Sequence, residues 1–379
     1  MTYIWQSPNW PSFEWQSAEL ATSLANVRLD QGRLIGRVES LGFRTREATF
    51  LRVLTDDVVK SSAIEGERLD EQQIRSSLAR RLGIDIDGFV TPSRSIEGIV
   101  HITLDATIDC FKPLTAERLF QWHAALFPTG RNEWGHRLRV GDWRDDSGGR
   151  MEIVPGAFGH EKVHYVAPPA DRLETEMKAF LDWFNGSQHM DPLLKAAIAH
   201  LWFVAIHPFG DGNGRITRAI ADMVLARSGG GAQRLYSMSA AIEKSRAGYY
   251  EALQSVTAHG DLDITRWVQW FFDRLSSAVS AALLTLDNVM LKNAFWQTHI
   301  ARGLNPRQAK VLNRLLEGNF EGKFTSTKWA KLTNASQDTA SRDISDLLAK
   351  GILRKGEAGG RSTAYELVVD VASDTQSHS

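Results

Sequence analysis

Residues 207–218 read His-Pro-Phe-Gly-Asp-Gly-Asn-Gly-Arg-Ile-Thr-Arg. Apolar stripes with helical spacing lie on both sides of this stretch, at residues 194–201 and 216–224. Pro208 lacks a backbone N–H, so the first helix is expected to end at or before the residue that precedes it. Glycine, asparagine and aspartate then favour a tight turn, and a second helix is expected to begin at about Asn213. The stretch therefore predicts two helices joined by a short loop.

The start of the second helix has the properties of an anion site. Backbone N–H groups converge there with the positive end of the helix dipole, and glycines let a phosphate approach closely. Arg215 and Arg218 lie one turn apart on the same face, so both can reach that anion. Asp211 supplies a hard oxygen ligand suited to Mg²⁺, and His207 can take a proton near neutral pH. Together these groups point to phosphoryl or nucleotidyl transfer.

The same string resembles the Fic signature His-x-Phe-x-(Asp/Glu)-Gly-Asn-Gly-Arg-x-x-Arg without departure. The resemblance extends from about Thr45 to Phe272 and implies a mainly α protein, a Fic helical core with a short β-hairpin flap. It implies a protein adenylyltransferase that uses ATP and Mg²⁺ to attach AMP to a Tyr, Thr or Ser hydroxyl of a target protein or of itself. A Doc-like kinase is disfavoured because those relatives depart from Gly-Asn-Gly. Transfer of other phosphate-containing groups on the same fold stays open.

The resemblance also implies a role for each motif residue. His207 would deprotonate the target hydroxyl, which attacks the α-phosphate of ATP while diphosphate leaves. Asp211 would bind Mg²⁺, and Arg215 and Arg218 would hold the β- and γ-phosphates. The anion hole would be formed by Gly212, Asn213 and Gly214. Such a set provides positioning and charge stabilisation, which are what this transfer mostly needs.

Two further segments resemble parts of the nucleotide and target site. Residues 151–154 and 162–166 flank a loose turn and predict a short hairpin, at the place where Fic proteins carry the flap that pairs with target backbone. The flap residues would be Val163, His164, Tyr165 and Val166; a purely structural hairpin stays open. Tyr249 and Tyr250 resemble a tyrosine pair that lines the adenine pocket in relatives, and a core role for one of them stays open.

Residues 61–66, Ser-Ser-Ala-Ile-Glu-Gly, resemble the Fic inhibitory motif (Ser/Thr)-x-x-x-Glu-(Gly/Asn). The functional positions would be Ser61, Glu65 and Gly66. Ser61 and Glu65 lie one helical turn apart and present to the same face. In the family this glutamate pairs with the second motif arginine, here Arg218, and so occupies the partner of the γ-phosphate. The resemblance thus implies an autoinhibited enzyme, and leaves open that Glu65 supports removal of AMP.

Composition places the chain among ordinary globular proteins. Lys plus Arg (44) nearly balances Asp plus Glu (45), so the whole-chain charge indicates no polyanionic partner. Cys110 is alone and cannot form an internal disulfide. Neither a signal peptide nor an apolar run long enough for a membrane span is seen, so we expect a cytoplasmic protein without membrane contact. Tryptophans among prolines in residues 3–16 indicate an extended arm that packs against a surface.

The chain is expected to contain four regions. These are an N-terminal arm and helical region with the inhibitory motif (1–92), a Fic domain (93–295), a winged-helix-like domain (301–367) and a disordered tail (368–379). Residues 301–367 carry twelve basic and seven acidic side chains, unlike the balanced whole. Short helices followed by a basic hairpin in this region resemble a winged helix-turn-helix.

That C-terminal module suggests an alternative function, a DNA-binding regulator whose Fic domain only senses nucleotide. Ser336 or Asn334 would cap the recognition helix, and the wing would carry Lys355 and Arg361. The exposed residues near the start of that helix would be Gln337, Thr339 and Arg342. Winged helices also bind proteins and form dimers, so DNA, a protein partner and a homodimer all stay open.

Overall fold

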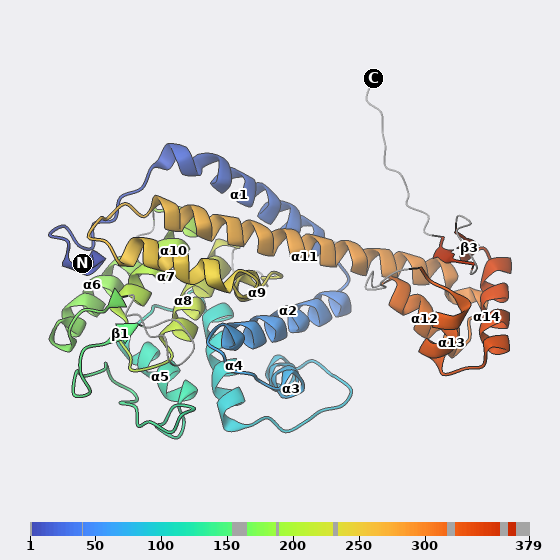
Figure 1. Ribbon diagram of the computed structural model, residues 1–379, viewed down its shortest axis with the longest axis horizontal. Helices are drawn as coiled ribbons and strands as arrows, with labels where there is room; N and C mark the ends of the chain where they lie inside the picture. The colour runs from blue at the N-terminus through green and yellow to red at the C-terminus, as the bar shows by residue number, and fades with distance from the viewer. Residues whose placement is uncertain are drawn as a thin grey trace. The chain divides into compact units, whose positions relative to one another are not determined.

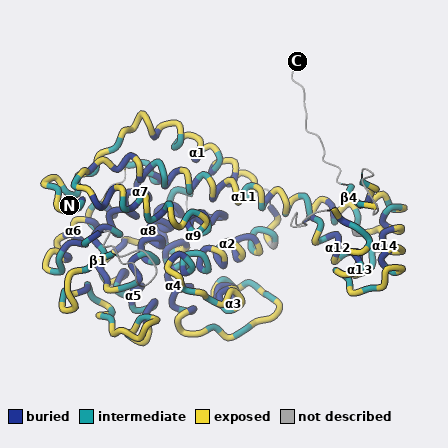
Figure 2. Tube along the Cα trace, in the orientation of Figure 1, coloured by how far each residue is buried: buried dark blue, intermediate teal, exposed yellow. Residues whose placement is uncertain are grey.

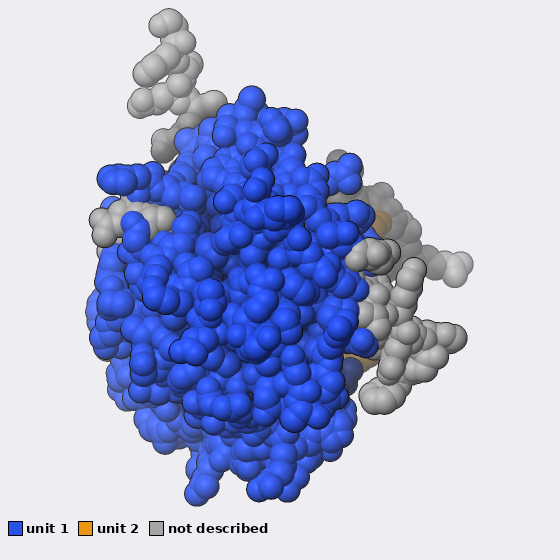
Figure 3. Space-filling model, turned by 90° about the vertical axis from the view of Figure 1, so that its left-hand side faces the viewer, with its two compact units in different colours: residues 1–282 blue, residues 283–379 orange. Residues whose placement is uncertain are grey.

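The computed structural model describes residues 2–39, 41–153, 165–186, 189–229, 234–316, 323–356 and 363–368. The chain divides into two compact units, residues 1–282 and residues 283–379, which Figure 3 draws in different colours. Most of the described chain is helical, and its strands form only two short antiparallel hairpins. The prediction of a mainly α protein is therefore confirmed.

The first unit is a set of helices with one short hairpin (Figure 1). Its elements are η1 (Ile4–Gln6), α1 (Ser17–Glu39), α2 (Phe43–Ile64), α3 (Glu71–Leu82), α4 (Arg94–Thr107), α5 (Ala116–Leu126), β1 (Glu152–Ile153), β2 (Tyr165–Val166), η2 (Ala170–Arg172), α6 (Leu173–Gly186), α7 (Pro192–Ile206), α8 (Asn213–Ser228), α9 (Met238–Glu243) and α10 (Arg246–Thr257). The helix α11 (Thr265–His299) begins in this unit.

Several of these helices begin at polar residues whose side chains satisfy free backbone N–H groups. Asp70, Ser93 and Thr115 accept from the N–H three residues ahead in α3, α4 and α5. Asp191 caps α7 in the same way, and Pro192 occupies the first helical position, where its missing N–H costs nothing. Local sequence chemistry therefore sets these helix starts.

Helices α7 and α8 form the centre of the first unit. Nearly every residue of α7 is buried, and Figure 2 shows both helices coloured mostly as buried. The helix α8 packs against α7 on one side and contacts α4, α5 and α2 on others. The indole of Trp267 in α11 donates to the backbone oxygen of Ala197 at 2.7 Å, which satisfies its N–H inside this core. The two helices that flank the loop of residues 207–212 are consequently fixed in the core of this unit.

The N-terminal arm docks on the first unit, as its tryptophans predict. The Trp5 indole donates to the backbone oxygen of Val166 at 2.7 Å, and the Arg172 guanidinium lies over its ring at 5.2 Å. The Trp10 indole donates to Glu176 at 2.8 Å and meets the Trp202 ring edge-on. The arm thus covers the strand β2 and part of α7.

The second unit holds helices α12 (Pro306–Leu316), α13 (Ser326–Thr333) and α14 (Gln337–Ala349), followed by strands β3 (Leu353–Lys355) and β4 (Tyr365–Leu367). The two strands pair antiparallel, with Arg354 opposite Glu366. Trp329 is fully buried among apolar side chains of the three helices. Three helices and a hairpin around one small core match the predicted order of elements. Assignment of this unit as a winged helix remains a prediction.

The candidate recognition residues of the second unit lie at the start of α14. Ser336 caps this helix by accepting from the N–H of Thr339 at 3.2 Å, and Asn334 instead ends α13 in a left-handed conformation. Arg342 is exposed, and the exposed Gln337 donates to Ser326 at 2.6 Å. Arg361 and the tail from residue 369 onward lie outside the described residues.

Across the described part of the chain, no helix combines the length and apolarity that a membrane span requires.

Candidate active site

The loop between α7 and α8 is built by one asparagine and two left-handed residues. His207 follows the end of α7 with φ 53°, and Gly212 precedes α8 with φ 79°. The buried Asn213 side chain accepts from the Phe209 N–H at 3.0 Å and donates to the Phe209 oxygen at 2.7 Å. A side chain at position 212 would bring its Cβ within 2.9 Å of the Phe127 ring, so only glycine fits. The predicted helix end and helix start are both confirmed.

His207 begins this loop, and a hydrogen bond to the backbone fixes the tautomer of its ring. Its Nδ1 lies 3.1 Å from the Val204 backbone oxygen, and because a carbonyl only accepts, Nδ1 carries the proton. In the neutral ring Nε2 then holds a lone pair. Burial lowers the pKa of His207 to about 4, so the ring is neutral near pH 7. These are the properties required of a general base.

Arg144 fixes the backbone at His207, a role that sequence reasoning missed. Its Nε donates to the His207 oxygen at 2.8 Å, and its backbone N–H donates to the Pro208 oxygen at 2.9 Å. The side chain is buried and pairs with Asp146 at 2.8 Å. Its contacts with His207 and Pro208 span more than sixty residues, so no local sequence signal marks this role.

A cluster of aromatic rings packs behind the loop. The buried His123 of α5 stacks on Phe209 with a centroid distance of 4.2 Å, and Trp143 lies 5.3 Å from the same ring. Burial lowers the pKa of His123 to about 4. These rings hold Phe209, and through Asn213 they also support the start of α8.

The predicted pairing between the inhibitory motif and Arg218 is present. Arg218 Nη1 lies 2.8 Å from Glu65 Oε1, its Nε donates to Ser61 Oγ at 2.9 Å, and its Nη2 donates to the Ser61 backbone oxygen at 2.8 Å. The Arg218 side chain is 3% exposed, whereas that of Glu65 is 33% exposed. Ser61 and Glu65 do face the same way from α2, and both engage this arginine.

The Glu65 carboxylate also lies against the first turn of α8. A Cβ placed on Gly214 would meet Glu65 Oε1 at 2.0 Å, which means that the carboxylate touches the glycine backbone. Glycine at 214 is therefore needed for this close approach. A negative charge at a helix N-terminus is stabilised by the helix dipole. Glu65 thus places its carboxylate against the backbone at the start of α8, where a helix stabilises an anion.

Arg215 has its own carboxylate partner, which the sequence did not reveal. Its Nη1 lies 2.8 Å from Glu67 Oε2, and its guanidinium stacks over the Phe127 ring at 5.2 Å. The Asp211 carboxylate lies farther away, at 3.9 Å from Nη2. Both motif arginines are therefore paired with the segment that follows α2.

A cavity of about 470 Å³ opens in front of the loop. Its lining includes several predicted site residues: Glu65, Tyr165, His207, Asp211, Gly212, Asn213, Gly214, Tyr249 and Tyr250. Tyr249 is buried, and its hydroxyl lies 2.9 Å from His200 Nε2. Tyr250 is half-buried, and its hydroxyl donates to the Ile64 oxygen at 3.3 Å, next to Glu65. Both tyrosines border the cavity, and Tyr249 also belongs to the core.

The predicted hairpin is present as the pair β1 and β2, with Ile153 opposite Tyr165. The Tyr165 side chain is buried and donates to the Ala205 oxygen at 2.8 Å, and burial raises its pKa well above the usual value. The Val166 oxygen accepts from Trp5 of the arm. Tyr165 and Val166 therefore anchor the base of the hairpin to the first unit. Val163 and His164 lie outside the described residues.

Asp211 offers a carboxylate, the kind of oxygen ligand that Mg²⁺ takes, next to the anion loop. Its Oδ1 accepts from the Gly212 N–H at 2.6 Å, and its carboxylate lines the cavity with the anion loop. Mg²⁺ in nucleotide sites takes one or two carboxylates together with phosphate and water oxygens. Within the described ranges no three His, Cys, Asp or Glu side chains converge as a metal cluster. The residues present fit a cation that arrives with a nucleotide.

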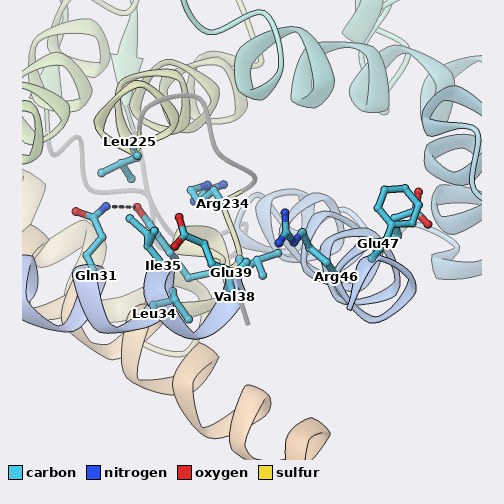
Figure 4. A pocket seen from close by; sticks show the side chains of 13 residues that line it. Gln31, Leu34, Ile35, Val38, Glu39, Arg46, Glu47, Leu225 and Arg234 are labelled. Atoms are coloured by element: carbon cyan, nitrogen blue, oxygen red, sulfur yellow. Dashed lines mark hydrogen bonds between the residues drawn. The ribbon is translucent and has the colours of Figure 1, made fainter. Parts of the chain in front are cut away.

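A different cavity, of about 400 Å³, lies between α1, α2 and the C-terminal end of α8 (Figure 4). Gln31 and Arg234 line it, and the Gln31 amide donates to the Tyr236 hydroxyl at 3.3 Å. The Arg234 guanidinium already pairs with Asp57 at 3.0 Å and with Asp222 at 2.9 Å. None of the predicted site residues borders this cavity.

The first unit is a helical domain with a glycine-rich loop at the start of a buried helix, an arrangement suited to binding an anion. Residues 113–225 match the Fic/DOC family, so the chain contains a Fic/DOC domain. Residues 3–84 match a domain of unknown function, DUF4172, which spans the arm and helices α1 to α3. Residues 61–66 and the loop of residues 207–213 therefore fall in two different matched regions.

Curated relatives share this region at moderate identity. The protein adenylyltransferase fic-1 of Caenorhabditis elegans is 30% identical over 223 residues, which cover 57% of this chain and 38% of that protein. The protein adenylyltransferase Fic of Culex quinquefasciatus is 30% identical over 211 residues, covering 54% of this chain and 37% of the relative. The chain thus spans well under half the length of these relatives.

Solved structures share the fold. A Fic family protein from Desulfovibrio desulfuricans G20 matches with a TM-score of 0.52 and 22% identity, covering 91% of this chain and 96% of that chain. A Fic domain containing signaling protein from Bacteroides thetaiotaomicron matches with a TM-score of 0.51 and 19% identity, covering 69% and 97%. At these identities the similarity concerns the fold.

Proposed function

We propose that the first unit is an autoinhibited protein adenylyltransferase, which transfers AMP from ATP to a hydroxyl side chain of a protein. The observation that carries the proposal is one cavity lined by His207, the Asn213-braced loop and Glu65, whose carboxylate pairs with the buried Arg218 behind it. The curated relatives named protein adenylyltransferase support the same reaction.

In this reaction the target hydroxyl gives its proton to His207 Nε2 as its oxygen bonds to the α-phosphorus of ATP. The bond between the α-phosphorus and the bridging oxygen breaks, and diphosphate leaves with that oxygen. Backbone N–H groups of Gly212, Asn213 and Gly214 would hold the α-phosphate oxygens. The base must be neutral beforehand, and the lowered pKa of His207 meets this condition.

The two motif arginines would hold the remaining phosphates. Arg215 would bind the β-phosphate and Arg218 the γ-phosphate, each with a planar fork of donors. Asp211 would hold Mg²⁺, which would supply positive charge to neutralise the phosphates. In this arrangement the protein acts mainly by positioning and by charge.

Glu65 would keep this enzyme silent at rest. Its carboxylate pairs with Arg218, the expected ligand of the γ-phosphate, and it also lies against Gly214. Nucleotide could bind productively only after this carboxylate has moved. The resting chain is therefore expected to transfer AMP slowly, and loss of Glu65 to release it.

Labelled ATP tests the proposal through incorporation of AMP into the protein itself and into proteins of a native lysate. Glu65→Gly is expected to raise incorporation, and adding His207→Ala is expected to abolish the increase. Incorporation equal with and without His207 would contradict the assigned base. Bound ATP without any modified protein would instead favour the DNA-binding regulator with a nucleotide-sensing Fic domain. Incubating AMP-modified protein with wild type tests the reverse reaction.

A further inference from the structure

Arg215 is held by a carboxylate that lies outside the inhibitory motif. Glu67 Oε2 lies 2.8 Å from Arg215 Nη1, and the two side chains are 28% and 13% exposed. This distance equals the one between Glu65 and Arg218. The ion pair is partly shielded from water, so it is stronger than one on an open surface.

The turn that ends α2 sets Glu67 beside Glu65. The Gly66 N–H donates to the Ala63 oxygen at 3.0 Å, and the Glu67 N–H donates to the Ser62 oxygen at 3.1 Å. With Gly66 at φ 93°, these two bonds form a Schellman turn, which folds the chain back over the helix end. Both carboxylates thereby face the first two turns of α8, where Arg215 and Arg218 lie three residues apart.

The remaining surroundings of Arg215 leave Glu67 as its nearest anion among the described residues. One face of the guanidinium stacks on Phe127, and Asp211 Oδ1 is 3.9 Å from Nη2. A β-phosphate that approached Arg215 would have to replace Glu67, just as a γ-phosphate would have to replace Glu65. The two replacements involve different atoms and different phosphates.

We propose that Glu67 is a second brake, which withholds Arg215 from the β-phosphate independently of Glu65. The inference rests on the proposed function, because it takes Arg215 as the β-phosphate ligand. When Glu65 alone is removed, Glu67 still pairs with Arg215 and still competes with the β-phosphate. ADP is the probe that isolates the second brake, because it has a β-phosphate and lacks the γ-phosphate for which Glu65 competes. AMP has neither and serves as the internal reference.

Isothermal titration of the full chain with ADP and with AMP, in the presence of Mg²⁺, tests this. His207→Ala is the background in every protein, so that no turnover occurs. Glu67→Gln is expected to tighten ADP binding about fivefold and to leave AMP binding unchanged. Glu133→Gln is the matched control: Glu133 lines the same rim as Glu67 and Arg215, and the substitution removes the same charge. It is expected to change ADP affinity by less than about twofold.

The outcomes separate the inference from the proposed function. ADP affinity that stays the same or weakens in Glu67→Gln, or tightens equally in Glu133→Gln, would overturn the second brake. A chain that binds neither ADP nor ATP in any variant would overturn the nucleotide site itself, and the brake with it. Should Glu67→Gln fail to fold, Glu67→Asp shortens the side chain while keeping its charge, and tighter ADP binding is again expected. In the activity assay, Glu65→Gly/Glu67→Gln should need about fivefold less ATP than Glu65→Gly for half-maximal incorporation.

Discussion

Two buried arginines pair with carboxylates from α2 and its C-cap, and the two pairs differ in how far solvent reaches the carboxylate. Arg218 pairs with Glu65 at the end of α2, and Arg234 pairs with Asp57 two turns earlier. Both arginine side chains are 3% exposed. The Asp57 side chain is 4% exposed, whereas that of Glu65 is 33% exposed and borders the cavity. One ion pair is closed to solvent and the other is open on one side.

The closed cluster of Arg234, Asp57 and Asp222 links α2, α8 and the segment before α9. Asp57 also accepts from Ser237 Oγ and from the Ser239 N–H. Burial alone would raise the pKa of Asp57, but Arg234 and these hydrogen bonds hold it below the usual value. Burial raises the pKa of the neighbouring Asp222 well above its usual value. In the folded protein Asp57 therefore carries the charge, and Asp222 retains its proton more readily.

The open pair differs because the Glu65 carboxylate borders the cavity and is partly exposed to solvent. Under the proposed function, a phosphate would offer Arg218 the same kind of partner that Glu65 provides, so it would replace Glu65 without leaving a buried charge unpaired. Arg234 lines a different cavity, but both of its carboxylates are buried with it. The comparison teaches that two ion pairs of similar length can differ in how far solvent reaches the carboxylate, and so in whether that carboxylate can be displaced.

The largest expected effect is on the closed cluster. Arg234→Met would leave two carboxylates without their cation in the protein interior, and is expected to lower the free energy of unfolding by about 3–5 kcal/mol. Urea denaturation measures the loss. Arg28→Met, which removes a half-exposed pair with Asp191, is the control and should cost less than about 1 kcal/mol. Equal losses in the two variants would contradict the structural role of Arg234.

Acid is expected to lower the free energy of unfolding through the buried His200. Burial, with a smaller effect from Arg218, lowers the pKa of His200 to about 3, against about 6.5 when unfolded. As pH falls below 6.5 the unfolded state takes up this proton first, so the free energy of unfolding decreases until about pH 3. Between pH 7 and pH 5, the free energy of unfolding of His200→Gln should fall by about 2 kcal/mol less than that of wild type, as denaturation at the two pH values measures.

The raised pKa of Asp222 shifts the free energy of unfolding in the opposite direction, because the folded state takes up this proton first. The variant Asp222→Asn should therefore lose more stability on acidification than wild type does.

The smallest expected change in stability belongs to the open pair. Glu65→Gln is expected to change the free energy of unfolding by less than about 1 kcal/mol, because solvent reaches the site and Ser61 still holds Arg218. The same variant should raise incorporation of AMP from labelled ATP. A loss of stability as large as that of Arg234→Met, without any gain in transfer, would make Glu65 a structural residue like Asp57.

The site could be predicted from the sequence where its parts are close together in the chain. The helix end at Pro208, the glycine loop and the helix start at Asn213 follow from local backbone rules, and the structure has them in those places. Glu65 became a partner of Arg218 only through resemblance to other proteins, since more than 150 residues separate them. Arg144, His123 and Glu67 carried no local signal at all.

The sequence by itself determined the chemistry available to this protein: an anion-binding helix start, two arginines one turn apart, a carboxylate and an imidazole within twelve residues. Local propensity and spacing are enough for that, because these groups share one turn and one helix. Only the tertiary structure decided which anions those arginines hold at rest. Packing of α2 on α8 brings Glu65 and Glu67 to them, and burial sets the pKa of His207. Such contacts depend on how distant helices fold together, which no local pattern encodes.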